Sequence, residues 1–383
     1  MNQNAQWSSL PKEGDGHFYW LDLIRFLAAF AVMASHFRGA FLEEYSLLPA
    51  SQQNIFSFVF YTATRLGFES VLIFFVLSGM LVGGKSIDRI QNRTFKSRDY
   101  VIDRSVRILL PLIASLLLFL PIAHIMGISP SIWVWLGSLF SLQGIFTPPL
   151  FDTLWSLSYE VWFYIIMLGL ALVVSKYSRT KSLIGLGILF IGMLVFMKLK
   201  VEFLFIWIIG ALTFVCYRNS RFRKNLFCCS LLLSLILLAG LQLTSESHSG
   251  TTTSSEWART IISIAFGLVF AIFLQQIIHL KPKSKVAFKC NDIGTKLAAF
   301  SYTLYLTHIP VMELLRYLGA PKSPTLNLTS ICLYAVWMIV AIAVAYIMYL
   351  LFEKNTPQVK KWIHQIVNRL SNKKKSATII EVV

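Results

Sequence analysis

Long apolar segments recur through nearly the whole sequence, and they constrain the fold more than any other feature. Each has about 18 residues or more, enough for an α-helix to cross the hydrocarbon core of a bilayer. Hydrophobic residues make up 56% of the 383 positions, a proportion that is rare in soluble chains of this length. The segments are apolar on all sides rather than alternating, which excludes a transmembrane barrel. The sequence therefore predicts an all-α, polytopic transmembrane helical bundle.

We expect ten spans, with both termini on the cytoplasmic side. The predicted ranges are 18–40, 66–84, 105–125, 153–175, 182–198, 202–217, 226–243, 258–279, 297–317 and 329–352. With this arrangement most of the 35 lysine and arginine residues fall in cytoplasmic segments, as the positive-inside rule requires. A missed helix would invert every later loop and remove that asymmetry. The segment 126–152 is apolar but short and bounded by prolines, so we expect an outer, interfacial or re-entrant segment there.

The net charge of +17 would suggest a nucleic-acid partner in a soluble protein. Membrane topology already explains its placement, so we expect no nucleic acid, although a basic inner face can bind an anionic metabolite. The chain divides into a cytoplasmic N-terminal segment at 1–17, a membrane domain at 18–355 and a basic cytoplasmic tail at 356–383. The polar start predicts no cleavable signal peptide. The five cysteines follow no metal-ligand spacing, so we expect neither a metal site nor a disulfide framework.

The first span, LDLIRFLAAFAVMASHFRGAF at 21–41, carries ionisable side chains that are costly in lipid. Arg25 and His36 lie about three helical turns apart, so they share one face at a separation of roughly 16 Å. Asp22 precedes Arg25 by one turn and can pair with it. Such groups usually face the bundle interior and mark a functional site. The structural alternative is an interfacial Asp22–Arg25 pair plus a histidine hydrogen-bonded between helices.

Two other spans carry acids at the depth expected for His36. Glu69 lies in RLGFESVLIFFVLSGMLVGG, and Glu160 lies in LWSLSYEVWFYI. A carboxylate beside an imidazole can fix its tautomer and raise its basicity, and Glu160 has the stronger functional case. Either acid can instead be structural. Ser78 and Gly79 indicate close helix packing.

Two further patterns combine polar side chains with helix ends or interiors. DRSVRILLP places Arg104 and Arg107 one turn apart where a helix enters the membrane, which makes a fork suited to phosphate. Topology alone also predicts basic residues at that place. SYTLYLTHIP spaces Tyr302, Tyr305 and His308 three apart on one face, where they can line a cavity or hydrogen-bond to one another in the core.

Together these stretches resemble the acyltransferase-3 family of integral membrane acyltransferases. The resemblance covers about residues 18–355 and rests on five stretches in order: Arg25-x10-His36, FFVLSGML at 74–81, Arg104-x-x-Arg107, WSLSYEVWFY at 155–164 and SYTLYLTHIP at 301–310. It implies transfer of an acyl group, commonly acetyl, from cytoplasmic acyl-CoA to a hydroxyl, often on a cell-surface polysaccharide or its lipid-linked precursor. It also implies His36 as the catalytic histidine, Arg25 as its motif partner, and Arg104 and Arg107 as the pair linked to the acyl donor.

The sequence departs from the family pattern in three places. Leu72 stands where many members have an acid just before FFVLSG, and Glu69, one turn earlier, is a candidate substitute. Tyr159-Glu160-Val161 keeps a single acid where the family often has two. We also expect no hydrolase-like domain after the membrane domain.

The resulting expectation is a membrane O-acyltransferase with His36 as general base, which can act directly or through an acyl-histidine intermediate. Arg25 and Glu160 are the other candidate catalytic residues, and Arg104 and Arg107 bind the donor. Acyl-CoA, by resemblance acetyl-CoA, is the donor substrate, and we expect no permanently bound cofactor. The expected partners are a glycan or lipid-linked sugar, the bilayer of the bacterial inner membrane and, as an open option, a second copy of the chain. A polytopic transporter or flippase is the alternative, although the sequence shows no repeated halves.

Overall fold

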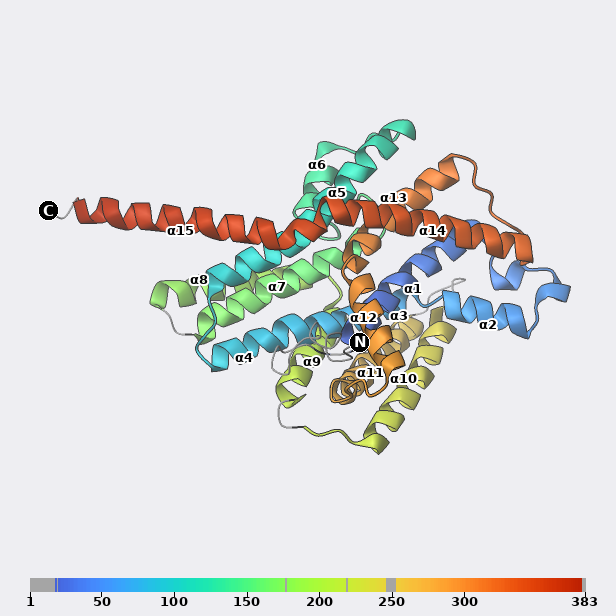
Figure 1. Cartoon of the computed structure of the whole chain (residues 1–383), viewed down its shortest axis with the longest axis horizontal. Helices are drawn as coiled ribbons and strands as arrows, with labels where there is room; N and C mark the ends of the chain where they lie inside the picture. Colours follow the sequence, from blue (N-terminus) through green and yellow to red (C-terminus); the bar gives the residue numbers. More distant parts are fainter. Residues whose placement is uncertain (1–17, 19, 176–177, 218–219, 246–252, 381–383) are drawn as a thin grey trace, which may run out of the picture.

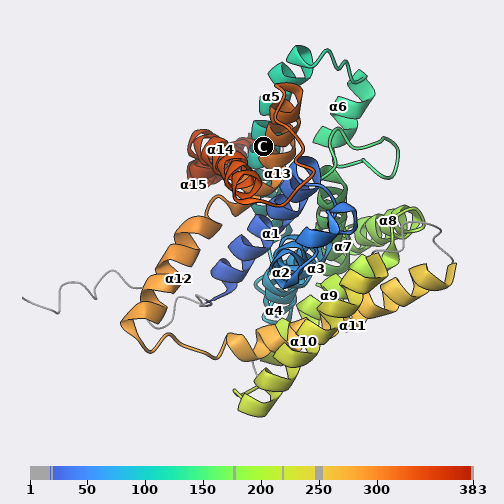
Figure 2. The same ribbon diagram turned by 90° about the vertical axis from the view of Figure 1, so that its right-hand side faces the viewer.

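The computed structural model describes residues 18, 20–175, 178–217, 220–245 and 253–380, and this part of the chain consists of helices and connecting loops, without a β-strand (Figures 1 and 2). The α-helices are α1 (Leu21–Phe41), α2 (Ile55–Thr64), α3 (Gly67–Ser78), α4 (Lys85–Gln91), α5 (Ser97–Ile125), α6 (Ile132–Leu139), α7 (Leu154–Val174), α8 (Arg179–Phe196), α9 (Val201–Tyr217), α10 (Lys224–Ser245), α11 (Thr253–Ile277), α12 (Lys285–Ala298), α13 (Ser301–Tyr317), α14 (Leu328–Leu351) and α15 (Thr356–Ile380). A π-helical segment, η4 (Gly79–Gly84), joins α3 to α4. Three short 3-10 turns, η2 (Tyr45–Leu47), η3 (Ala50–Gln52) and η5 (Glu353–Asn355), complete the elements.

Within the described residues, eight helical stretches are long and apolar enough to cross a membrane. The apolar helix α9 is shorter, at 17 residues, and α13 has the same length. Every predicted span coincides with one of these helices, so the transmembrane helical bundle is confirmed. The count of ten and the cytoplasmic placement of both termini stay predictions. Large apolar side chains cover the outside of helices such as α10, where Leu232, Leu235 and Ile236 are exposed, as a lipid-facing surface requires.

Helix α1 lies at the centre of the bundle and packs against α3, α12, α13 and α14. Its buried face includes Val32, Met33 and Phe37, which are almost completely enclosed. The Tyr334 hydroxyl of α14 donates a hydrogen bond to the Ala34 carbonyl oxygen at 3.0 Å. Because α1 packs against several helices, the positions of its ionisable side chains relative to those helices are fixed.

The passage from α3 into η4 packs against α9 with almost no space between the backbones. A Cβ atom added at Gly79 would overlap the Trp207 carbonyl, and one added at Gly210 would overlap the Val76 carbonyl. Small residues permit this approach in membrane bundles, as the Ser78-Gly79 pair predicts. The π-helical turn follows directly, and such turns often occur at functional sites.

The segment 126–152 contains only one short helix, α6, whose 8 residues span about 12 Å and cannot cross a bilayer. It folds back on the start of α7, where the Ser158 hydroxyl donates to the Ser141 carbonyl oxygen at 2.8 Å. The Gln143 side-chain amide donates to the Leu154 carbonyl oxygen at 2.6 Å. The segment therefore adds no span, and the side of the membrane on which it lies stays a prediction.

The predicted basic tail forms α15, which runs out beyond the other helices (Figure 1). Its first turns pack on the start of α5. Lys360 pairs with Asp103 at 3.0 Å, and Arg98 donates to the Asn368 side-chain oxygen at 2.7 Å. The tail thus contacts the helix that carries Arg104 and Arg107.

Candidate active site

A cavity of about 400 Å³ opens between α1, α3, α4, α5, α7 and α13. Its wall is mostly apolar along α3, through residues such as Val71 and Phe74, and mixes polar and apolar side chains elsewhere. The polar side chains that line it are Asp22, Arg25, Ser78, Lys85, Arg89, Arg104, Arg107, Ser156, Glu160, Tyr164, Ser301, Tyr302 and Tyr305. The structure therefore brings together five of the stretches that the sequence singled out.

The position of Arg25 in this wall depends on how α1 begins. Trp20 precedes the helix with a positive φ of 72°, a conformation that costs about 1–3 kcal/mol in a residue other than glycine. Two hydrogen bonds offset that cost, since its backbone N–H donates to Asn291 Oδ1 at 3.0 Å and its Nε1–H to the Leu280 carbonyl oxygen at 2.9 Å. Helix α12, which lies beside the start of α1 in Figure 2, supplies Asn291.

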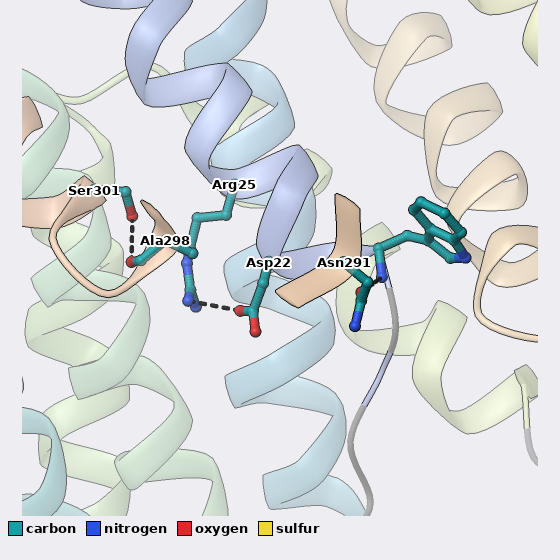
Figure 3. A network of polar contacts seen from close by, with 6 residues as sticks. Asp22, Arg25, Asn291, Ala298 and Ser301 are labelled. Atoms are coloured by element: carbon teal, nitrogen blue, oxygen red, sulfur yellow. Dashed lines mark hydrogen bonds and ion pairs between the residues drawn. The ribbon is translucent and has the colours of Figure 1, made fainter. Parts of the chain in front are cut away.

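Arg25 pairs with Asp22 at 2.7 Å (Figure 3). The predicted pair is present, with each side chain roughly a quarter exposed, at 24% and 22%. The pair uses the guanidinium Nη2, while the buried Nε–H of Arg25 has no partner among the described residues. One donor of the Arg25 guanidinium is therefore buried without a hydrogen bond.

Basic side chains dominate one end of the cavity. Arg104 and Arg107 line it from α5, and Lys85 and Arg89 line it from α4. The guanidinium of Arg104 lies 5.7 Å from the ring centre of Tyr164, and its buried Nε–H has no partner within the described part of the chain. With Arg25, these residues give five cationic side chains in the wall against two acids. The arrangement favours a polyanion.

Glu160 accepts a hydrogen bond from the hydroxyl of Tyr164, one helical turn later on α7, at 2.5 Å. The same hydroxyl lies 3.3 Å from Ser78 Oγ, which in turn accepts the indole N–H of Trp207 at 3.2 Å. The i,i+4 spacing of Glu160 and Tyr164 was readable from the sequence, whereas the contact with Ser78 depends on the fold. The network holds the carboxylate of Glu160 at the cavity wall.

Tyr302 and Tyr305 line the cavity from α13, as one of the two sequence interpretations expects. The hydroxyl of Tyr302 is buried without a hydrogen-bond partner among the described residues. The hydroxyl of Tyr305 lies 2.5 Å from Ser156 Oγ on α7. The ring of Tyr305 also contacts His308, with 6.0 Å between ring centres. Tyr305 therefore connects the cavity wall with the histidines described next.

His36 and His308 face each other next to the cavity rather than in its wall. His36 Nδ1 lies 2.9 Å from His308 Nε2, and the rings stack with 5.2 Å between centres. His308 is fully buried, and His36 is partly exposed. The two residues lie on α1 and α13, and no signal in one sequence predicts that they pair.

Neither of the acids that the sequence placed at the depth of His36 forms a hydrogen bond to it. Glu160 is bound to Tyr164. Glu69 is buried elsewhere, between α3 and α10, where it accepts from the Gln242 side chain at 3.0 Å. Asp152, in the turn before α7, interacts electrostatically with His36, and sequence reasoning missed it because it lies outside the predicted motifs.

Glu353 is a second residue that the sequence did not indicate, because it stands just beyond the last predicted span. Its Oε2 accepts the backbone N–H of Thr303 at 3.2 Å and the Thr303 hydroxyl at 2.5 Å. A carboxylate at this place stabilises the N-terminal turn of α13. Glu353 also interacts electrostatically with Arg107 and Arg25, so it balances part of the basic charge beside the cavity.

The arrangement provides three chemical functions next to one another. The basic end can hold phosphates, the apolar wall of α3 can accommodate a flexible, largely uncharged chain, and the histidine pair can accept a proton. Among the described residues, no group of three or more His, Cys, Asp or Glu side chains is placed to hold a metal ion.

Comparison with protein-family models matches residues 18–350 to the acyltransferase domain of the acyltransferase-3 family. This range includes α1, the cavity-lining helices and almost all of α14. Neither the curated proteins nor the solved structures include a match to the chain.

Proposed function

Because the chain belongs to the acyltransferase-3 family, we propose that this membrane acyltransferase moves an acyl group, with acetyl favoured, from acyl-CoA to a hydroxyl. The acceptor we propose is a sugar of a cell-surface glycan or of its lipid-linked precursor. The observation that carries the proposal is the basic cavity whose lining includes Tyr305, the ring neighbour of His308 in the His36–His308 pair. The bacterial inner membrane, with both termini cytoplasmic, is the location that fits these substrates.

In this proposal the donor enters from the cytoplasm. Arg104 and Arg107 hold phosphates of the coenzyme, with Lys85 and Arg89 close by. The unpartnered Nε–H of Arg104 supports this role, since a buried donor without a partner is costly unless a ligand satisfies it. The pantetheine arm then extends along Val71 and Phe74 of α3 toward Tyr305.

His36 acts as the general base. Its free ring nitrogen takes the proton of the acceptor hydroxyl while the hydroxyl oxygen attacks the thioester carbonyl carbon. The carbon–sulfur bond breaks as the new ester forms, and the departing thiolate takes the proton from His36. The products are the acylated sugar and CoA with a free thiol. In this proposal Arg25, which lines the cavity, binds the donor, and Glu160 binds acceptor hydroxyls.

The test is release of CoA from acetyl-CoA by purified full-length protein in nanodiscs, with a panel of lipid-linked sugars and polysaccharides. We expect acceptor-dependent thiol release, and an acceptor whose mass increases by one acetyl group. His36→Ala abolishes both, whereas His124→Ala leaves both unchanged because His124 lies exposed at the far end of α5. Undiminished release by His36→Ala would remove His36 as the base. Movement of a sugar across the bilayer without a covalent product would favour the transporter.

A further inference from the structure

The imidazole of His308 has a defined partner on each ring nitrogen. Its Nδ1 lies 3.1 Å from the carbonyl oxygen of Leu304, one turn earlier on α13. Its Nε2 lies 2.9 Å from His36 Nδ1. The ring is fully buried, so no solvent competes for either nitrogen.

These contacts determine which nitrogen of each ring carries the proton. A carbonyl oxygen only accepts, so Nδ1 of His308 must be the protonated nitrogen. In the neutral ring, Nε2 of His308 then carries a lone pair and accepts a hydrogen bond from Nδ1–H of His36. His36 is left with a bare Nε2. No acid in the described part of the chain forms a hydrogen bond to His308, and charging a buried ring without such a partner is costly.

We propose that His308 is a positioning residue that holds His36 in the Nδ1–H tautomer and so makes Nε2 of His36 the proton acceptor. The role as base rests on the proposed function, but the tautomer does not. When Nε2 takes a proton, the hydrogen bond from Nδ1 to His308 becomes charge-assisted and therefore stronger. A neutral imidazole thus does here what a carboxylate does for the histidine of many hydrolases.

The groups around the pair agree with this assignment. Asp152 interacts electrostatically with His36 without a hydrogen bond to either ring nitrogen of the pair. The ring of Tyr305 packs against His308 in a T-shaped arrangement, while its hydroxyl lies within hydrogen-bond distance of Ser156. The competing interpretation is that the histidine pair only fastens α1 to α13.

Two substitutions separate these interpretations. His308→Gln offers an amide oxygen with a reach similar to that of Nε2, so it can still accept the Nδ1–H of His36. His308→Met fills similar space without an acceptor of comparable strength. Thr307→Val is a matched control, since Thr307 is the buried polar neighbour on α13 and its hydroxyl donates to the Thr303 carbonyl oxygen of its own helix.

The first readout is the tautomer of His36, measured by NMR on full-length protein labelled with ¹⁵N-histidine in nanodiscs. The signals of His36 are identified by their absence from His36→Ala. We expect the Nδ1–H form in the wild type, Thr307→Val and His308→Gln, and a substantial Nε2–H population in His308→Met. An Nε2–H tautomer in the wild type overturns the proposal even if His308→Met fails to fold. So does an unchanged tautomer in His308→Met.

The second readout is kcat for acetyl transfer beside KM for acetyl-CoA. Because general base catalysis contributes about 10²–10⁴-fold, we expect His308→Met to lower kcat by about 100-fold with an unchanged KM. His308→Gln should recover most of that loss. Equal kcat values for the two variants at equal thermal stability would reduce the pair to a structural contact. If no acceptor supports CoA release while the tautomers behave as predicted, the transferase function fails and the positioning role of His308 stands.

Discussion

Arg104 provides the sharpest test of the donor site, because its cationic side chain lines the cavity and its buried Nε–H has no partner among the described residues. Arg104→Gln removes the cation but keeps a polar side chain of similar length. The pantetheine part of the donor touches no phosphate-binding group in the proposed pose. The substitution should therefore weaken binding of CoA and leave binding of pantetheine, which carries no phosphate, unchanged.

The magnitude follows from the kind of contact that is lost. A hydrogen bond to a charged group contributes about 1.5–3 kcal/mol, and each 1.4 kcal/mol changes Kd about tenfold. The basic end is partly open to solvent, since Arg107 is exposed, so the lower part of that range applies. We expect the Kd of CoA to rise about 10-fold to 30-fold, measured by calorimetry on protein in nanodiscs. The effect should shrink at high salt.

Arg98→Gln is the matched control. Arg98 lies on the same helix and bonds to Asn368 of α15, outside the cavity wall. We expect its Kd for CoA to stay within about twofold of the wild type, as exposed surface pairs contribute little. An equal loss in both variants, or an equal loss for CoA and pantetheine in Arg104→Gln, would refute a phosphate contact at Arg104.

Two further predictions concern stability. Gly79→Ala places a Cβ against the α9 backbone, so it should destabilise the protein by about 1–3 kcal/mol. In the control Gly187→Ala the added Cβ meets nothing within 4 Å, so the change should be near neutral. Equal melting temperatures of the two variants would contradict the close contact at Gly79. Glu43 accepts from Lys322 at 2.8 Å, and that hydrogen bond lowers the pKa of the carboxyl. The stability it contributes is present at neutral pH and is lost as the pH falls below about 4. The melting temperature of Lys322→Gln should therefore fall less on acidification than that of the wild type, and parallel falls would exclude the effect.

The sequence predicts the bundle well because the signal for a membrane helix is local. An apolar stretch of sufficient length is enough to place α1, α5 or α7. The break from α3 into a π-helical turn at Gly79 was not predictable, because it depends on contact with α9. The position of the tail helix α15 against α5 was also not predictable, because the Lys360–Asp103 pair joins segments far apart in the chain.

In the candidate site, too, the features set by local spacing were predictable and the contacts between distant segments were not. Arg104 and Arg107 are one turn apart, so their spacing alone predicts that both reach one cavity wall. The partner of His36 is His308, 272 residues away on α13, whereas the sequence pattern predicted a carboxylate beside His36. Glu353 escaped notice because an acid just after a span usually faces water. Only its hydrogen bonds to Thr303 indicate its place beside the basic cavity.

The most direct test of the account is a cryo-electron microscopy structure of the protein with a non-reactive thioether analogue of acetyl-CoA. The account predicts phosphate density beside Arg104 and Arg107, the pantetheine arm along α3, and the acyl group past Tyr305 next to His36 Nε2. An analogue bound outside this cavity, or an acyl group directed away from His36, would contradict it.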